Sequence, residues 1–158
     1  MGFRARELMR GWHEFADGAG PPGRQPFSFR ASWGPDSIRD WLNPTRPTFL
    51  WQELEGTVSA GGLCADAPCR GTLELDYFRR RRIRYDFDFD VAGTTYRYVG
   101  EKTNLRLWNL AVTHTTCYGV VTERRTGKLV STGTTLFHLR DLPRLLLVQP
   151  TRRLAEGA

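Results

Sequence analysis

The sequence contains no long hydrophobic run. Crossing a bilayer takes roughly 18 to 20 consecutive apolar residues, and no segment of the 158 residues approaches that length. The opening segment, MGFRARELMRGW, also lacks an apolar stretch of signal-peptide length. We therefore expect no membrane insertion and a cytoplasmic location.

Cysteine is scarce as well. Cys64, Cys69 and Cys117 are too few, and odd in number, for a disulfide framework, which favours a reducing compartment. Cys64 and Cys69 lie close enough along the chain to pair or to contribute to a metal site. No second Cys or His pair follows them, and the three histidines are dispersed. The sequence therefore predicts no metal site.

Motifs for nucleotide cofactors are also missing. The Gly-Ala-Gly and Gly-Gly segments do not join a strand to a helix, so they form neither a phosphate loop nor a dinucleotide fingerprint. The sequence has no nucleophile elbow either. We expect no cofactor and no nucleotide-dependent catalysis.

The positive charge is large but poorly concentrated. A net charge of +6 and a pI near 9.7 come mainly from arginine, and such a surplus favours nucleic acid, anionic lipid or acidic small molecules. Only Arg79 to Arg82, extended by Arg84, form a cluster, and it lacks the interleaved aromatic residues of a nucleic-acid surface. The sequence therefore predicts no nucleic-acid partner.

The composition that is present is that of one globular domain. Hydrophobic residues make up 40% of the chain and aromatic residues 12%, which is enough to form a core. We expect a single domain, 1–158, with a helical and loop segment over 1–47, a β-barrel over 48–140 and a C-terminal arm over 141–158.

The N-terminal segment carries helix and loop signals. Phe3 to Asp17 places its apolar residues at nearly helical spacing and predicts a helix. Residues 18–26 are rich in glycine and proline and predict a loop, with a short strand over Phe27 to Trp33 after it. Pro35 to Leu42 predicts a short second helix. At the other terminus, Leu142 to Ala155 predicts a helix or an irregular arm.

Beyond Thr48 the hydrophobic period changes from helical to alternating. In Arg82 to Val91 every even-numbered residue is charged and every odd-numbered residue is apolar, and Ala92-Gly93 predicts a tight turn. Successive strands without helices between them indicate a mainly β fold, an antiparallel meander that closes into a lipocalin-like β-barrel. The predicted strands are Phe49 to Ser59, Gly71 to Phe78, Arg82 to Val91, Thr94 to Lys102, Ala111 to Glu123 and Leu129 to Leu139.

The last two predicted strands have no cleanly apolar face. Hydroxyl groups, a histidine and a tyrosine share one side of the Ala111 to Glu123 strand, which is typical of a cavity wall with a few polar anchors. The alternative is cross-strand threonine pairing on a solvated face. Gly119 and Gly133 would allow a ligand to approach closely or a strand to bend. Which face points inward stays open.

Several polar side chains are candidates for acid and base chemistry. His114 titrates near neutrality, and Tyr118 lies on the same side of its strand. Glu101 and Lys102 face opposite sides of an extended strand, so only one of them can enter the interior. The candidate catalytic residues are His114, Glu53 and Tyr118. The candidate ligand-binding residues are Trp108, Tyr96, Tyr98, Thr116, Thr134, Trp51 and Phe137.

Four segments carry a loose pattern: 49–58, 82–102, 107–119 and 131–146. The matched residues are Phe49, Glu53, Gly56, Arg84, Tyr85, Gly93, Tyr96, Gly100, Lys102, Trp108, Thr115, Thr116, Tyr118, Gly133 and Leu136. These segments resemble an accessory β domain that accompanies GMC-type sterol oxidoreductases, which are cholesterol-oxidase-like proteins, in actinobacteria. The resemblance implies a lipocalin-like or calycin-like module that handles apolar molecules, without the flavin-binding part, and a flavin-dependent oxidoreductase as its partner.

These observations predict a barrel that binds an apolar small molecule, sterol-, lipid- or polyketide-like, in its interior. One alternative is a cofactor-free cyclase or isomerase that preorganises a flexible substrate and uses one acid or base residue. Another is a structural partner domain of an oxidoreductase. An oligomer is compatible with each of these hypotheses.

Overall fold

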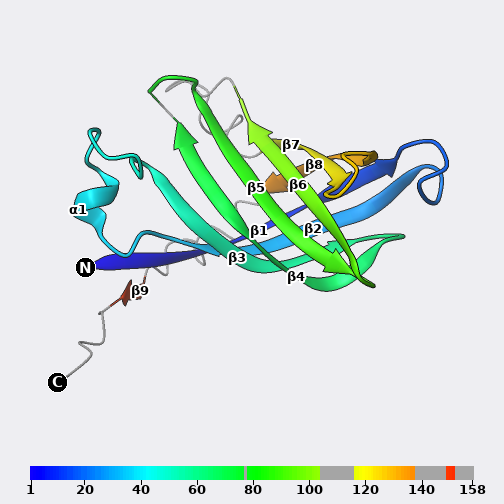
Figure 1. The fold of residues 1–158 in the computed structure, drawn as a ribbon, viewed down its shortest axis with the longest axis horizontal. Coiled ribbons are helices and arrows are strands. Elements are labelled where there is room, and N and C mark those ends of the chain that lie inside the picture. The colour runs from blue at the N-terminus through cyan, green and yellow to red at the C-terminus, as the bar shows by residue number, and fades with distance from the viewer. Residues whose placement is uncertain (77, 104–115, 138–148, 152–158) are drawn as a thin grey trace.

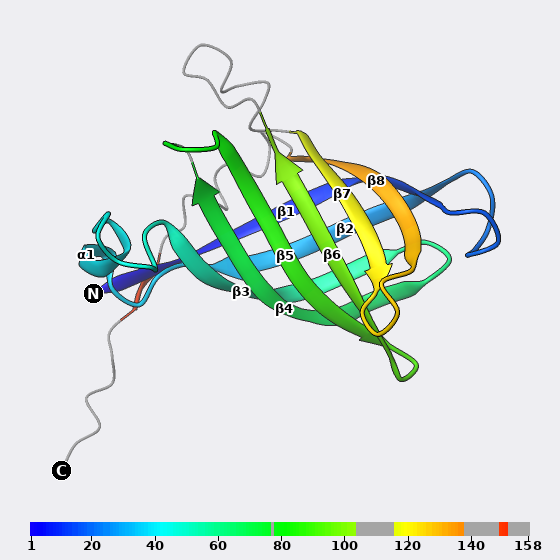
Figure 2. The ribbon, with the colours of Figure 1, turned by 45° about the horizontal axis from the view of Figure 1, so that its top comes forward.

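The computed structural model describes residues 1–76, 78–103, 116–137 and 149–151. The chain is mainly β, and eight strands form a closed antiparallel barrel (Figure 1, Figure 2). Strands that are neighbours in sequence pair along a meander, and β1 closes it by pairing with both β2 and β8. The elements are β1 (Gly2–Phe15), β2 (Arg24–Trp33), α1 (Ile38–Trp41), β3 (Trp51–Ala60), β4 (Cys64–Asp76), β5 (Arg82–Val91), β6 (Thr94–Lys102), β7 (Thr116–Glu123), β8 (Leu129–Phe137) and β9 (Gln149–Thr151).

The predicted N-terminal helix is wrong, because the segment forms strand β1. Met9 and His13 are buried on its inner face, whereas Arg10 and Glu14, the residues that follow each of them, are exposed. This alternation was hidden because the inner face also carries a glutamate, a glycine and a histidine instead of a row of apolar residues. Pairing with strands on both sides favours the extended backbone over the helix.

The strand β5 and its hairpin to β6 confirm the prediction from alternation. Both strands have the predicted bounds, and Ala92 and Gly93 form the turn with positive φ angles of 49° and 84°. The odd-numbered residues of β5 up to Phe89 are at most 4% exposed, so its aromatic face points inward. The short helix α1 also lies inside the predicted segment.

The observed bounds of other elements differ from the predicted bounds. β4 begins at Cys64, before the predicted Gly71, because the cysteine-containing segment pairs with β3 around the turn at 61–63. The predicted residues 111–115 and 138–139 lie outside the described residues. In the predicted C-terminal helix or arm, the described residues 149–151 form β9, which pairs with the start of β1.

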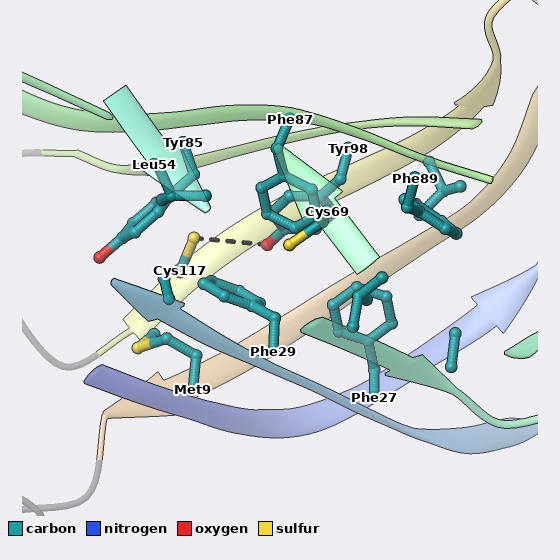
Figure 3. Packing of buried hydrophobic residues seen from close by; sticks show 14 of the residues in the cluster. Met9, Phe27, Phe29, Leu54, Cys69, Tyr85, Phe87, Phe89, Tyr98 and Cys117 are labelled. Atoms are coloured by element: carbon teal, nitrogen blue, oxygen red, sulfur yellow. Dashed lines mark hydrogen bonds between the residues drawn. The ribbon is translucent and has the colours of Figure 1, made fainter. Parts of the chain in front are cut away.

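Aromatic rings fill the middle of the barrel (Figure 3). The Tyr98 ring stacks on Phe87 with 4.8 Å between centroids and on Phe27 with 5.3 Å. Phe29 contacts Tyr98 and Phe87 at 5.5 and 5.4 Å. A Cβ atom at Gly119 would lie 2.3 Å from the Tyr98 ring, so this glycine makes room for a core side chain.

Four short connections lie at one end of the barrel, at 16–23, 61–63, 92–93 and 124–128. We call this the hairpin end. At the opposite end β3 and β5 begin and β4 and β6 finish. The segment that contains α1 lies beside that opposite end, next to the start of β1 (Figure 1).

Candidate functional site

Three predicted ligand-binding residues lie on the inner face of the barrel. Tyr98 is buried among the core aromatic rings, and Tyr96 stacks on Phe89 with 5.5 Å between centroids. Phe137 is partly buried against the core. Trp108 and His114 lie outside the described residues, so their predicted roles stay predictions.

The remaining predicted residues do not reach the interior. Tyr118 is 62% exposed, and its cross-strand partner Thr134 shares the outer face with Thr116. Trp51 and Glu53 alternate with the buried Gln52 and are exposed on the outside of β3. The threonine-rich faces of β7 and β8 therefore point outward, which corrects their interpretation as a cavity wall.

A group of polar side chains is buried inside the barrel at the end opposite the hairpins. Glu7 from β1 is 8% exposed, Tyr85 from β5 is 1% exposed and Lys102 from β6 is 4% exposed. The Tyr85 hydroxyl donates a hydrogen bond to a Glu7 carboxylate oxygen. We call these three residues the polar cluster, and the end that holds them the polar end.

The register of the sheet brings Lys102 to this place. Lys102 of β6 pairs with Ile83 of β5, and its side chain shares the inner face of β6 with that of Tyr98. Its Nζ atom lies 5.4 Å from the Tyr85 ring centroid and 6.0 Å from that of Phe137, within reach of cation–π attraction. Among the described residues no carboxylate forms an ion pair with Lys102.

Burial controls the titration of the groups around the polar cluster. Desolvation, and then the neighbouring Glu7 carboxylate, hold the pKa of the Tyr85 phenol well above its usual value. Burial also raises the pKa of the Cys117 thiol to about 11. The Cys117 sulfur lies 3.6 Å from the Tyr98 hydroxyl, as the dashed line in Figure 3 marks. These groups therefore stay protonated at neutral pH.

The polar end also holds buried donors that lack partners. Trp33 Nε1 and Gln52 Nε2 are buried without a hydrogen bond to another described residue, and they lie at the last residue of β2 and the second residue of β3. Buried polar groups are almost always paired in folded proteins. Two such donors at one end indicate a place where a ligand supplies acceptors.

The hairpin end differs because its buried polar group is fully paired. His13 Nε2 lies 2.9 Å from the Gly61 carbonyl oxygen, which can only accept. The Nδ1 atom is then the acceptor for the Ser131 hydroxyl at 2.9 Å. Desolvation lowers the pKa of His13, so the ring is neutral and structural.

A pocket of about 210 Å³ opens on the outside of the polar end. The segment with α1 forms one wall through Asp36, Asp40 and Trp41, and the start of β3 forms another through Trp51 and Glu53. Two residues predicted for the barrel interior therefore meet in an outer pocket instead.

The described part of the chain holds neither a disulfide nor a cluster of metal-ligating side chains. Cys64, Cys69 and Cys117 are free thiols, and burial raises the pKa of Cys69 to about 12. No group of three or more His, Cys, Asp or Glu side chains within the described ranges could hold a metal ion. None of the described helices has the length and apolar character needed to span a membrane.

The chain matches no known protein family, no curated protein and no solved structure. The closed barrel and the chemistry of its two ends are therefore the basis for a functional conclusion.

Sequence reasoning missed the polar cluster, although signals for it were present. Lys102 lies an even number of residues from Tyr96 and Tyr98, which places all three on one face of β6. Glu7 was hidden by the helix prediction. Tyr85 was assigned only to the apolar wall, and nothing in its own strand shows the partner that its hydroxyl finds on β1.

Proposed function

We propose that the barrel binds an apolar small molecule, sterol-, lipid- or polyketide-like, which carries an oxygen acceptor that it directs to the polar end. The observation that carries this proposal is the buried Lys102 ammonium over the ring of Tyr85, whose hydroxyl donates to Glu7. Ligand sites in proteins combine apolar walls with a few placed polar groups. The polar end has both.

The unpaired groups at the polar end determine which chemical group of the ligand can bind there. Trp33 Nε1 donates hydrogen bonds and cannot accept them, and the Lys102 ammonium is also a donor only. A ketone, ester or carboxylate oxygen satisfies such donors, whereas a hydrocarbon leaves them unpaired. Aromatic rings fill the middle of the barrel. The apolar part of the ligand therefore lies at the polar end and not deep in the interior.

Calorimetric titration tests this proposal with probes that share an apolar chain. We expect saturable binding of 2-decanone and decanoate and none of decane at its solubility limit, with progesterone as a sterol-like probe. Losing a hydrogen bond to a charged group costs about 1.5 to 3 kcal/mol, so Lys102→Met should weaken binding of decanoate by roughly tenfold or more.

The chain offers a matched control because it has only one other lysine, Lys128. Lys128 lies exposed in the connection between β7 and β8 at the hairpin end. Lys128→Met should leave binding unchanged. Equal effects of the two lysine variants, or no saturable binding of any probe, would refute the proposal.

A second candidate function is a cofactor-free isomerase or cyclase. It is favoured by the hydrogen bond between Tyr85 and Glu7 beside a buried cation, which is an arrangement suited to general acid–base chemistry. Lys102 would polarise a substrate carbonyl, and the Glu7 carboxylate would accept the proton from the neighbouring carbon and return it to another position. No oxidant is needed, because the proton and the electron pair stay within the substrate and Glu7.

Deuterium exchange distinguishes the enzyme from the binder. We expect the enzyme to speed incorporation of deuterium beside the carbonyl of 2-decanone in D₂O, measured by NMR, and Glu7→Gln to abolish this effect. Glu14→Gln, on the exposed end of β1, is the control. A saturable binder that gives no exchange above the buffer rate rejects the enzyme and keeps the binding function.

The resemblance to the oxidoreductase accessory domain supports a third proposal, a partner role toward a flavin-dependent oxidoreductase. The outer faces of β7 and β8 favour it, because Tyr118 and Val120 are exposed there and no charged residue lies between them. Sedimentation of the mixed proteins should show a complex that the double variant Tyr118→Ser, Val120→Ser disrupts. Failure of the wild-type chain to form a complex with the oxidoreductase of the same organism rejects this role.

A further inference from the structure

The pocket outside the polar end is lined by charges of the sign opposite to that of the whole chain. Asp36, Asp40 and Glu53 line it together with only one cationic side chain, Arg4, so its walls carry two negative charges more than positive ones. The chain as a whole has a net charge of +6. The pocket is thus an acidic site on a basic protein.

The carboxylates in this pocket are not equally engaged. Asp36 lies 3.4 Å from Arg4, and Asp40 lies 3.8 Å from Arg46. Within the described ranges of the chain, Glu53 forms no ion pair. Glu53 is therefore the carboxylate that is free to meet a cation from solution.

Two indole rings accompany the carboxylates. Trp41 is held in place by an edge contact from Phe3, with 5.5 Å between ring centroids, and by its Nε1 hydrogen bond to Gln52 Oε1 at 2.6 Å. Trp51 is 37% exposed and lies next to Glu53 on the opposite wall. Indole faces attract organic cations more strongly than other aromatic rings do.

Gln52 provides an independent sign of a ligand. Its side chain lines the pocket and the residue is only 2% exposed. Because Oε1 accepts the bond from Trp41, the orientation of the amide is determined and Nε2 is the donor. That Nε2 atom is buried and has no hydrogen-bond partner among the described residues, so these residues supply no acceptor at this point of the pocket.

We propose that this pocket binds a small organic ammonium compound that carries a hydrogen-bond acceptor a few atoms from its charge. The ammonium group lies against Glu53 and the indole rings of Trp41 and Trp51, and the acceptor takes the Gln52 Nε2 hydrogen. None of the residues of the polar cluster lines this pocket. The site is therefore separate from the polar cluster.

Three probes separate the two parts of this recognition. N-acetylethylenediamine carries both an ammonium group and an amide carbonyl, ethylammonium carries only the charge, and N-ethylacetamide carries only the carbonyl. Ligand-observed NMR at neutral pH should show saturable binding of N-acetylethylenediamine. N-ethylacetamide should bind about tenfold more weakly, because it lacks the charge-assisted contact, and ethylammonium should bind several-fold more weakly, because it lacks the acceptor for the neutral Gln52 Nε2 group.

Two glutamates on the same face of β3 give a matched pair of variants. Glu53→Gln removes the charge that lines the pocket, and we expect about tenfold weaker binding of N-acetylethylenediamine. Glu55→Gln removes an exposed charge two residues along the strand, beside Arg70 and outside the pocket, and should leave binding unchanged. Thermal unfolding of both variants checks that each retains the fold.

Several outcomes would overturn the proposal. These are the absence of saturable binding of N-acetylethylenediamine, equal affinities in the two glutamate variants, or binding of N-ethylacetamide as tight as that of the ammonium probe. Equal affinity for ethylammonium and N-acetylethylenediamine would overturn the acceptor assigned to Gln52 Nε2. The site is supported if N-acetylethylenediamine binds about tenfold more tightly than N-ethylacetamide and if this preference is lost in Glu53→Gln but not in Glu55→Gln.

Discussion

The two ends of the barrel hold buried polar groups in opposite conditions. At the hairpin end, both ring nitrogens of His13 are hydrogen-bonded at 2.9 Å, to Ser131 and to Gly61. At the polar end, Lys102 has aromatic neighbours, and the buried donor Trp33 Nε1 has no partner among the described residues. The structural role of a scaffold alone does not account for this difference between the two ends.

This difference indicates which end of the barrel contributes most to stability and which contributes to ligand binding. Short connections bring strand ends together at the hairpin end, and aromatic stacking fills the space between them. Unpaired buried donors cost stability, and they persist at sites where a ligand or substrate completes the hydrogen bonding. We therefore expect core substitutions near the hairpins to change stability and substitutions at the polar end to change ligand binding.

The largest effect should come from Phe89→Ala near the hairpin end. Phe89 is fully buried and stacks on Tyr96, so its removal leaves a cavity and should lower the free energy of unfolding by about 3 to 5 kcal/mol. Urea denaturation measures this change. Phe78→Ala, at a site 77% exposed, should stay within about 0.5 kcal/mol. Equal losses would contradict an aromatic interior as the source of stability.

A tyrosine from each end gives the sharpest comparison. Tyr85→Phe removes the hydroxyl that donates to Glu7 and leaves that carboxylate buried, so we expect a loss of about 1.5 to 3 kcal/mol in the free energy of unfolding. Tyr96→Phe removes a hydroxyl with no hydrogen bond among the described residues and should cost under about 0.5 kcal/mol. Adding Glu7→Gln to Tyr85→Phe should recover part of the loss, and no recovery would argue against a charged Glu7.

The third effect concerns His13 and its dependence on pH. His13→Leu leaves the Gly61 carbonyl and the Ser131 hydroxyl without their partner, which should cost about 1 to 2 kcal/mol at pH 8. Because burial lowers the pKa of His13 in the folded state, the wild type loses stability as the pH falls below the ordinary value of 6.5 and down through the folded pKa.

The leucine variant lacks this titration, so the stability difference between wild type and His13→Leu should shrink as the pH falls from 8 to 5. Denaturation curves across that range measure it. A difference that stays constant would show that His13 does not titrate differently in the folded and unfolded states.

The smallest effect should come from the outer surface of β5. Asp86 accepts two hydrogen bonds from Arg97, at 2.9 and 2.6 Å, which lower the pKa of that carboxyl. Side chains at this surface stay partly solvated, so Asp86→Asn should cost only about 0.2 to 1 kcal/mol. The contribution is present above the unfolded value of 3.8 and lost as the pH falls through the lower folded pKa. A variant equal to the wild type at pH 7 would contradict it.

Local alternation was enough to predict part of the fold. The charged and apolar faces of β5, the turn at Ala92-Gly93 and the bounds of β6 follow from neighbouring residues alone. β1 could not be found in this way, because its inner face includes Glu7, Gly11 and His13, and each is accommodated by a partner on another strand. A mixed inner face has no signature in its own sequence.

The candidate sites show the same limit more strongly. Trp51 and Glu53 were found as candidates, but the structure places them in an outer pocket with the segment of α1. Tyr118 was found as well, and it lies outside because the glycine and cysteine side of β7 packs on Tyr98. Residue chemistry identified several relevant side chains, and their location depended on contacts that no local pattern contains.

By itself the sequence determined a mainly β chain with an apolar inner wall at β5, because alternation with a period of two is a local property of an extended backbone. The tertiary structure decided which mixed face points inward and that Lys102, not Glu101, is buried. It also decided that Glu7 meets Tyr85 across 78 residues of sequence. Closure of the sheet through β1 brings these groups together, so the polar end exists only in the closed barrel.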